Sequence, residues 1–222
     1  MQIVITGANR GIGLELARQF IQRGDTVTAL VREPDRAKEL KQLGISVVRC
    51  DVSRDESVRA AAKQVPAAID VLVNNAGMMG RSDGLEALKE EEALTVLGTN
   101  ALSAVLVTRA LLPQLRAGKR KAVMLVTSGL GSIEDNTSGG HYAYRMSKAA
   151  LNMAGRTLAV DLRADGISVA VINPGWVQTD MGGRSAPTPV EESARGIIAR
   201  IDELGPATSG LFLDFRGKTS AW

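Results

Sequence analysis

Two side chains in the stretch from residue 142 to 151 could do acid–base chemistry together. Tyr144 and Lys148 are four residues apart, so on a helix they lie on one face, one turn apart. A free phenol has a pKa near ~10, and a neighbouring cation favours the phenolate, so the spacing predicts a lowered pKa for Tyr144. A general acid or base works best near its own pKa. The pair alone is weak evidence, because this spacing often arises by chance.

The elements that must position this pair alternate along the chain. Short apolar runs predict strands at residues 2–6, 26–31, 46–50, 71–74, 122–127, 168–172 and 211–214. Segments with helical period predict helices at 11–23, 35–43, 55–64, 90–116, 143–163 and 190–204. Such alternation predicts an α/β fold: a Rossmann-like, doubly wound parallel sheet of about seven strands with helices on both faces. No linker divides the chain, so we expect a single domain over residues 1–222.

Composition excludes several classes of function. The 222 residues are 45% apolar and 23% charged, which is ordinary for a soluble globular protein. The single cysteine, Cys50, excludes an internal disulfide and fits a reducing compartment, so we expect a cytoplasmic protein without a signal peptide. The longest uncharged run, 93–108, falls short of the ~18 residues of a membrane span. The net charge of +3 is spread along the chain, which argues against nucleic-acid binding.

A glycine-rich turn joins the first predicted strand to the first predicted helix. Glycines let backbone approach a phosphate, and a helix N-terminus offers free N–H groups. The spacing is G-x-x-x-G-x-G rather than G-x-G-x-x-G, and a plain β–α turn is the alternative. The position in the chain favours a dinucleotide site, with contacts expected from Gly7, Asn9, Arg10, Gly11, Ile12 and Gly13.

The end of the second predicted strand indicates which dinucleotide. An acidic residue there binds a ribose 2′-hydroxyl, whereas an arginine accommodates a 2′-phosphate. Val31 cannot bind a hydroxyl, and Arg32 follows it directly, with Arg10 expected near the same point. We therefore expect NADP(H) to be preferred, with NAD(H) possible, because Glu33 could instead point inward and hold the ribose.

Polar residues also follow later strands. Asp51 and Val52 are expected to contact adenine, although a helix cap is the competing role for Asp51. Asn75, Ala76 and Gly77 close the fourth strand, where ligands bind in open α/β sheets, although Asn and Gly also favour turns.

Two further polar residues are candidates for the chemistry itself. Asn100 lies in an apolar helical stretch, where an amide needs a partner; it could hold a water chain leading to Lys148. Ser128 ends the fifth strand and could donate a hydrogen bond to a substrate oxygen, although a lone serine there is often a cap. His141 has no second histidine or cysteine nearby, so we expect no metal site.

Taken in order, these motifs span nearly the whole chain, and together they resemble the short-chain dehydrogenase/reductase family. The resemblance rests on Thr6-Gly7-x-x-x-Gly11-x-Gly13, Asn74-Asn75-Ala76-Gly77, Asn100, Ser128, Tyr144-x-x-x-Lys148 and Pro174-Gly175-x-x-x-Thr179. The stretches 142–152 and 174–183 are similar to the C-factor branch and to Sniffer-type carbonyl reductases.

The resemblance implies a role for each matching residue. Tyr144 would be the general acid/base, and Lys148 would lower its pKa and bind the nicotinamide ribose. Ser128 would orient the substrate carbonyl, and Asn100 would support a proton relay. Thr179 would bind the nicotinamide carboxamide. Further cofactor contacts are expected from Pro174, Gly175 and Val177.

Two departures from the family pattern leave the substrate open. Ser128 and Tyr144 are about three residues further apart than usual, with the extra residues expected in 134–140, and little chain follows Thr179. The Gly- and Pro-containing stretch 177–189 could act as a lid. Candidate pocket walls are Leu130, Tyr142, Trp176 and Met181.

We therefore expect an oxidoreductase that transfers hydride between NADP(H) and a carbonyl or secondary alcohol, with a small-molecule substrate. The alternative is a C-factor-like signalling or dinucleotide-sensing protein with little turnover. We also expect a homodimer or homotetramer. Its interface is expected to involve Met146, Ala150, Met153 and Thr157 from one helix, and Val105, Leu112 and Leu115 from another.

Overall fold

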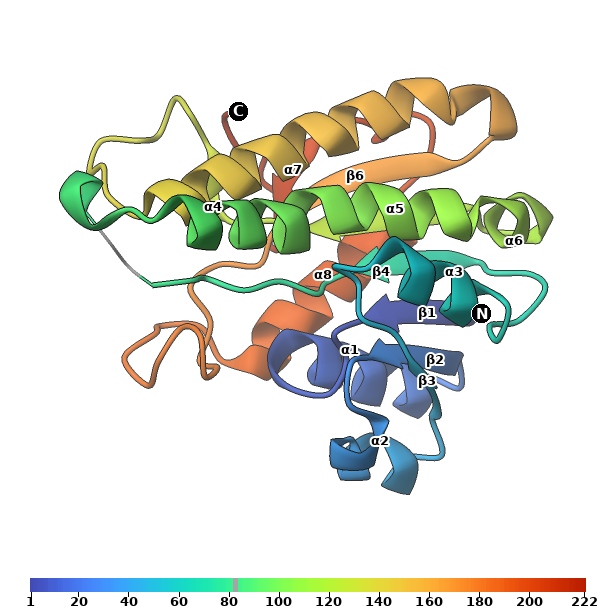
Figure 1. The fold of residues 1–222 in the computed structure, drawn as a ribbon. Helices are drawn as coiled ribbons and strands as arrows, with labels where there is room; N and C mark the ends of the chain where they lie inside the picture. Colours follow the sequence, from blue (N-terminus) through green and yellow to red (C-terminus); the bar gives the residue numbers. More distant parts are fainter. Residues whose placement is uncertain (82–83) are drawn as a thin grey trace.

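The computed structural model describes residues 1–81 and 84–222, and its centre is one parallel sheet of seven strands (Figure 1). The strands are β1 Gln2–Thr6, β2 Thr26–Val31, β3 Ser46–Arg49, β4 Val71–Asn74, β5 Ala122–Val126, β6 Ser168–Asn173 and β7 Phe212–Asp214. Their order is β3-β2-β1-β4-β5-β6-β7, and every paired register is parallel. The predicted fold class is confirmed.

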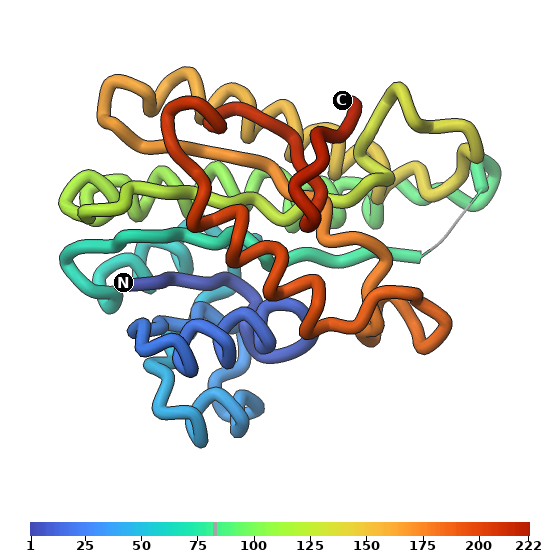
Figure 2. Tube along the Cα trace, turned by 180° about the vertical axis from the view of Figure 1, so that it is seen from behind, coloured from blue at the N-terminus to red at the C-terminus, as the bar shows by residue number. Residues whose placement is uncertain are grey.

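Helices cover both faces of the sheet because successive strand residues point to opposite sides. Ile3 and Ile5 of β1 belong to a core shared with α1 and α8, whereas Val4 belongs to a core shared with α3, α5 and α7. Figure 2 shows α1 and α8 on the face opposite to α7. The helices are α1 Gly11–Gln22, α2 Lys38–Gln42, α3 Asp55–Ala62, α4 Glu90–Leu97, α5 Ser103–Ala110, α6 Leu112–Ala117, α7 Tyr142–Asp161 and α8 Val190–Glu203.

The helix expected over 90–116 is divided into α4, α5 and α6. A π-helical turn, η3 Gly98–Leu102, separates α4 from α5. Leu111 leaves helical geometry before Pro113, which lacks the N–H donor that a continuing helix needs. The stretch Glu90–Ala110 is long and apolar enough to cross a membrane, but its residues Val96 and Val107 are buried in this fold.

The helix expected over 35–43 is also divided. A 3₁₀ turn, η1 Pro34–Arg36, is followed by Ala37 with non-helical backbone angles, and only then by the short α2. The remaining predicted elements agree with the structure to within about two residues, which is the usual uncertainty of helix ends.

The strand order reverses between β1 and β4, and in open α/β sheets ligands bind outside the carboxyl ends of the strands at such a point. The glycine-rich turn follows β1 and Asn75 follows β4, so both lie at this switch point. Ser128 lies two residues beyond β5, the next strand in the sheet. The topology therefore gathers the residues that the sequence placed far apart.

Candidate active site

Tyr144 and Lys148 lie on the buried face of α7, as their spacing predicts. Tyr144 is 7% exposed and Lys148 is 4% exposed. The Lys148 Nζ donates a hydrogen bond to the main-chain oxygen of Val126 at 3.0 Å, and it lies 5.6 Å from the centre of the Tyr144 ring. The end of β5 therefore fixes the ammonium close to the phenol.

Burial governs the pKa of both groups. Burial raises the pKa of the Tyr144 phenol, and a hydrogen bond with Ser128 partly opposes that rise. The direction is opposite to the one expected from the Tyr144–Lys148 spacing, because removal of the phenol from water is the largest influence on its pKa and the hydrogen bond with Ser128 opposes it only in part. Burial also lowers the pKa of Lys148 to about 8, since an ammonium loses hydration inside the protein.

Ser128 follows β5 and begins the turn that packs against α7. Its Oγ accepts a hydrogen bond from the Leu130 N–H at 3.1 Å, which starts the 3₁₀ turn η4 Gly129–Gly131. Gly131 packs directly on α7, and a Cβ built on it would lie only 2.8 Å from Lys148 Cβ. This close packing requires glycine and holds the turn that positions Ser128.

Asn100 lies in the π turn, and its amide makes three hydrogen bonds to two residues. Oδ1 accepts from the Met78 N–H at 2.8 Å, while Nδ2 donates to the Met78 oxygen at 2.7 Å and to Ser147 Oγ at 2.9 Å. A Cβ on Gly77 would lie 3.3 Å from Asn100 Oδ1 and 3.6 Å from Lys148 Nζ. Asn100 therefore joins the segment after β4 to α7, beside Lys148. π turns of this kind occur frequently at functional sites.

The glycine-rich turn fits a phosphate-bearing ligand. Gly7 and Gly11 have φ of 66° and 54°, which favours glycine. A Cβ on Gly13 would lie 2.5 Å from Asn75 Nδ2 and 2.6 Å from the Gly7 oxygen. The first N–H groups of α1 begin at this turn, and a helix N-terminus attracts anions. The cradle is therefore built from close backbone contacts that a larger residue would fill.

Asn75 and Thr6 lock this turn to β4. The Asn75 amide donates to the oxygens of Thr6 at 2.9 Å and Gly7 at 3.2 Å. The Thr6 hydroxyl accepts the N–H groups of Asn75 at 3.0 Å and Ala76 at 2.9 Å. The side chain of Asn75 thus shapes the turn itself.

The side chains of the two arginines expected to bind a 2′-phosphate are both exposed. The Arg32 side chain is 75% exposed and lies 3.9 Å from Glu33, whereas Glu33 lies closer to Arg36, at 2.9 Å. The Arg10 side chain is 67% exposed and lies 3.7 Å from Asp180. Exposed pairs at such distances contribute little, so both arginines can rearrange toward an anion.

Asp51 has a local partner in the turn after β3. Its Oδ1 accepts hydrogen bonds from the N–H of Ser53 at 3.1 Å and from the Ser53 hydroxyl at 2.6 Å. This is an Asx-type turn and not the helix cap expected as the alternative to adenine contact, because the N-cap of α3 is Arg54. Val52 is 9% exposed.

The stretch after β6 brings Thr179 to the glycine-rich turn. A Cβ on Gly11 would lie 3.3 Å from Thr179 Cγ2. Pro174 is held by a hydrogen bond from Ser193 Oγ at 2.7 Å, and Gly175 has φ of 84°. Val177 pairs with Thr188, which closes the loop between them into a compact unit.

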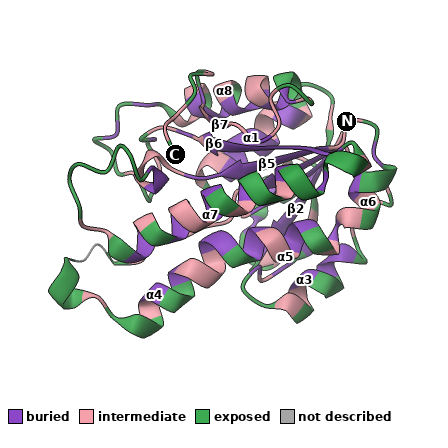
Figure 3. Ribbon diagram, turned by 90° about the horizontal axis from the view of Figure 1, so that it is seen from above, coloured by how far each residue is buried: buried purple, intermediate pink, exposed green. Residues whose placement is uncertain are grey.

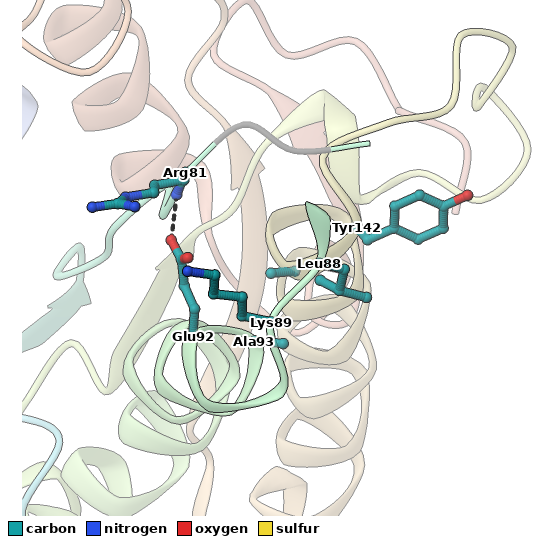
Figure 4. Close-up of a pocket in the computed structure, with 7 residues that line it drawn as sticks. Arg81, Leu88, Lys89, Glu92, Ala93 and Tyr142 are labelled. Atoms are coloured by element: carbon teal, nitrogen blue, oxygen red, sulfur yellow. Dashed lines mark hydrogen bonds between the residues drawn. The ribbon is translucent and has the colours of Figure 1, made fainter. Parts of the chain in front are cut away.

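The expected pocket walls lie at different depths. Leu130 is half-buried in η4, while Trp176, Met181 and Tyr142 are exposed. Trp176 Nε1 donates to the Gly182 oxygen at 2.7 Å, which fixes the indole on its own loop. Figure 4 shows the Tyr142 ring pointing away from Glu92 and Lys89 at the rim of a small pocket. That pocket is lined by Arg81, Leu88, Lys89, Glu92, Ala93, Tyr142 and Ala143 and lacks the buried acid–base pair, so it is not the candidate active site.

Sequence reasoning gave no role to three polar residues that support the site. Ser147 donates to the Tyr144 oxygen at 2.7 Å and accepts from Asn100, and Asn152 donates to the Gly131 oxygen at 3.2 Å. Thr6 belongs to the glycine-rich motif, and its hydroxyl accepts hydrogen bonds from the N–H groups of Asn75 and Ala76. Ser147 lies three residues after Tyr144, and Asn152 lies four residues after Lys148. This helical spacing places both polar residues on the same face as the pair, and it could have indicated their supporting role.

The fold and site together define an α/β protein with a glycine-rich β1–α1 turn and a buried tyrosine–lysine pair. Comparison with known proteins agrees. The sequence profile of a family described as short chain dehydrogenase matches residues 1–189. The chain therefore belongs to the short-chain dehydrogenase family, whose members are oxidoreductases, and the predicted family and enzyme class are confirmed.

Three similar proteins place the chain within this family. The C-signal protein of Myxococcus xanthus is 47% identical over 154 residues, covering 69% of this chain and 93% of its own. The solved structure of the carbonyl reductase Sniffer of D. melanogaster has a TM-score of 0.96 at 34% identity, covering 100% of this chain and 99% of that one. An NADPH-bound carbonyl reductase from chicken fatty liver has a TM-score of 0.93 at 32% identity, covering 100% and 98%.

Proposed function

We propose that the protein is an NADP(H)-dependent carbonyl reductase that acts on small aldehydes, ketones or quinones, or on the corresponding secondary alcohols. The observation that carries this proposal is the buried Tyr144 phenol, whose pKa is influenced by Ser128 and whose ring centre lies 5.6 Å from Lys148 Nζ. The similarity to two solved carbonyl reductases supports it.

The mechanism follows from the positions of these side chains. The bound nicotinamide supplies the hydride. Ser128 Oγ hydrogen-bonds the substrate carbonyl oxygen, and Tyr144 donates its phenolic proton to that oxygen as negative charge develops. Lys148 places a positive charge beside the phenolate that remains, which favours proton release. Asn100 holds the Met78 backbone and Ser147 around this group.

The cofactor would extend from this group to the glycine-rich turn. Residues 7–13 would hold the pyrophosphate, and Arg10 and Arg32 would bind the 2′-phosphate. The pairing of Glu33 with Arg36 supports NADP(H), because it occupies the carboxylate that would otherwise bind a bare ribose. The NADPH in the chicken carbonyl reductase supports the same choice.

The deciding experiment mixes the protein with NADPH and a panel of aldehydes, ketones and quinones, and follows NADPH absorbance. We expect turnover with at least one of these carbonyl classes. NADPH binding without turnover across the whole panel would contradict the proposal.

The second candidate is a signalling or dinucleotide-sensing protein with little turnover. The 47% identity to a protein named C-signal favours it. A sensor needs the cofactor cradle but not Ser128 and Tyr144, both of which are present. The same panel separates the candidates, because a sensor would bind NADPH without oxidising it.

We further propose a homodimer formed through the exposed side of α7. Met146, Met153 and Val160 are exposed and recur every seven residues on α7, and Leu102 is exposed on η3. Figure 3 shows exposed residues along the outer side of α7. Leu115, expected in this interface, is fully buried in the protein's own core, and Ala150 and Leu112 also pack against that core.

A further inference from the structure

The chain doubles back after the last strand of the sheet. Asp214 Oδ1 accepts the N–H groups of Arg216 at 3.0 Å and Lys218 at 2.8 Å, which forms a turn. Thr219 then pairs antiparallel with Leu213, so the chain returns alongside β7. This short hairpin is outside the matched family region, residues 1–189, and the proposed mechanism does not use it.

The hairpin places Trp222 in contact with the loop that follows Ser128. The main-chain oxygen of Trp222 accepts from the N–H groups of Ile133 at 2.9 Å and Glu134 at 3.0 Å, and from Ser132 Oγ at 3.3 Å. The indole packs on the fully buried Phe212, with ring centres 5.5 Å apart. In Figure 2 the red end of the chain lies beside the yellow-green loop.

One 3₁₀ turn connects this contact to the proposed active site. Ser132 N donates to the Gly129 oxygen at 3.0 Å, which closes the turn that begins at Ser128. On the inner side, Asn152 of α7 donates to the Gly131 oxygen at 3.2 Å. The segment from 128 to 134 is therefore held between α7 and Trp222, and residues 134–139 beyond it are exposed.

We infer that Trp222 is a positioning residue for the substrate side of the site: it holds the loop at 132–134 and, through η4, the hydroxyl of Ser128. The inference rests on the proposed function for its effect on catalysis. Without Trp222 the N–H groups of Ile133 and Glu134 lose their acceptor, and the turn can relax away from Tyr144. The glycine-rich turn follows β1, two strands away from β5, so NADPH affinity should not change.

The test compares deletion of Trp222, Trp222→Ala, Trp222→Phe and a control in the same hairpin, Lys218→Ala. We expect kcat/KM for a carbonyl substrate to fall about tenfold in Trp222→Ala, because small displacements of catalytic groups cost that much or more. The deletion should lose more, and Trp222→Phe should recover most of the activity. The Kd for NADPH should stay within about twofold in all variants, since global destabilisation alone would weaken both.

Two measurements that do not require catalytic activity test the contact between Trp222 and the loop at 132–134. Hydrogen exchange at the Ile133 and Glu134 amides should accelerate about tenfold or more in the deletion variant. Ultraviolet titration of the two tyrosines should show a higher pKa for Tyr144 in the deletion variant than in the wild type. The reason is that the hydrogen bond with Ser128, which lowers this pKa, is weakened when the turn relaxes. If wild-type protein shows no turnover, the proposed function fails, while these two readouts still decide the role of Trp222.

The deletion could disturb folding, so Ser132→Ala provides a milder change. It removes the hydroxyl that bridges the Trp222 oxygen and the Asp135 N–H, at 3.3 and 3.1 Å. Ser132→Ala should also accelerate amide exchange and lower kcat/KM, each by a smaller factor than the deletion of Trp222. Wild-type exchange rates and an unchanged Tyr144 titration in both the Trp222 and the Ser132 variants would overturn the inference.

Discussion

At the scale of single residues, Tyr144 is the proposed general acid. Phe at this position keeps the ring in its buried site and removes only the transferable proton. We predict that Tyr144→Phe lowers kcat by about 10²–10⁴-fold, the usual contribution of general acid catalysis, and leaves the Kd for NADPH almost unchanged. Steady-state kinetics and a binding titration measure the two quantities.

Tyr142→Phe is the matched control, because Tyr142 is the other tyrosine and is exposed at the start of the same helix. It should keep near-wild-type turnover. Loss of turnover in Tyr142→Phe together with its retention in Tyr144→Phe would show that the acid is misassigned.

Lys148 gives a pH dependence of stability. Its pKa is about 8 in the folded chain against 10.5 in its unburied state, so between these values the unfolded chain holds one more proton. The free energy of unfolding therefore rises with pH across this window, by up to about 1.4 kcal/mol per pH unit and about 3 kcal/mol in all. Below the folded pKa the charged, buried ammonium lowers stability.

Lys148→Met lacks this titration and serves as the reference. Urea unfolding of both proteins, from below pH 8 to above pH 10.5, should show wild type gaining stability relative to the variant as pH rises. Parallel pH profiles for the two proteins would mean that Lys148 keeps its ordinary pKa in the fold.

At the scale of elements, the β1–α1 turn depends on close backbone contact. We predict that Gly13→Ala weakens NADPH binding by at least about tenfold, because its Cβ would overlap Asn75 Nδ2 and the Gly7 oxygen, at 2.5 and 2.6 Å. Isothermal titration with NADPH measures the change. Gly205→Ala is the control, since a Cβ built there meets nothing within 4 Å of it in the described structure and should leave the Kd unchanged. Equal affinities of the two variants would argue against the cradle.

The elements also show where sequence reasoning succeeded. Short, mainly apolar runs such as 71–74 and 122–127 predicted strands, because strands buried on both faces need few polar residues. The motifs after these strands then met at one edge of the sheet by topology alone. Residue spacing could not show the π turn at 98–102, since a long apolar stretch looks the same with or without one extra residue in a turn.

The depth of a side chain was also beyond the sequence. Leu115 has the helical spacing of an interface residue, yet it is fully buried in the protein's own core. The net pKa direction of Tyr144 could not be predicted either, because it depends on how completely α7 and η4 exclude water. Both properties arise from packing between distant segments.

At the scale of the whole molecule, charges from separate elements should select the cofactor. Arg10 precedes α1 and Arg32 follows β2. Because charged hydrogen bonds contribute about 1.5–3 kcal/mol each, we predict that the wild type binds NADPH at least about tenfold more tightly than NADH. Combined Arg10→Ala and Arg32→Ala substitution should remove most of this preference.

Dissociation constants for both cofactors provide the measurement, and Arg59→Ala on α3 is an exposed control that should keep the preference. Tighter binding of NADH by the wild type would refute the assignment. So would a double variant that still strongly prefers NADPH.

The outer side of α7 should determine the oligomeric state. We predict a solution mass near twice 23.5 kDa by light scattering, and a shift to the monomer mass in Met153→Glu. Leu85→Glu is the matched control, because Leu85 and Met153 are both 67% exposed but Leu85 lies outside α7. A wild-type mass near 23.5 kDa at micromolar concentration would contradict the dimer.

The π turn at Gly98–Leu102 has a consequence for how this protein can change. An α-helix rotates by about 100° per residue, so the extra residue in the turn sets α4 and α5 out of rotational phase by about that angle. Deleting one residue there would restore a single straight helix and would turn Asn100 away from Met78 and Ser147. A more regular helix would therefore lose the hydrogen bonds by which Asn100 joins the segment after β4 to α7.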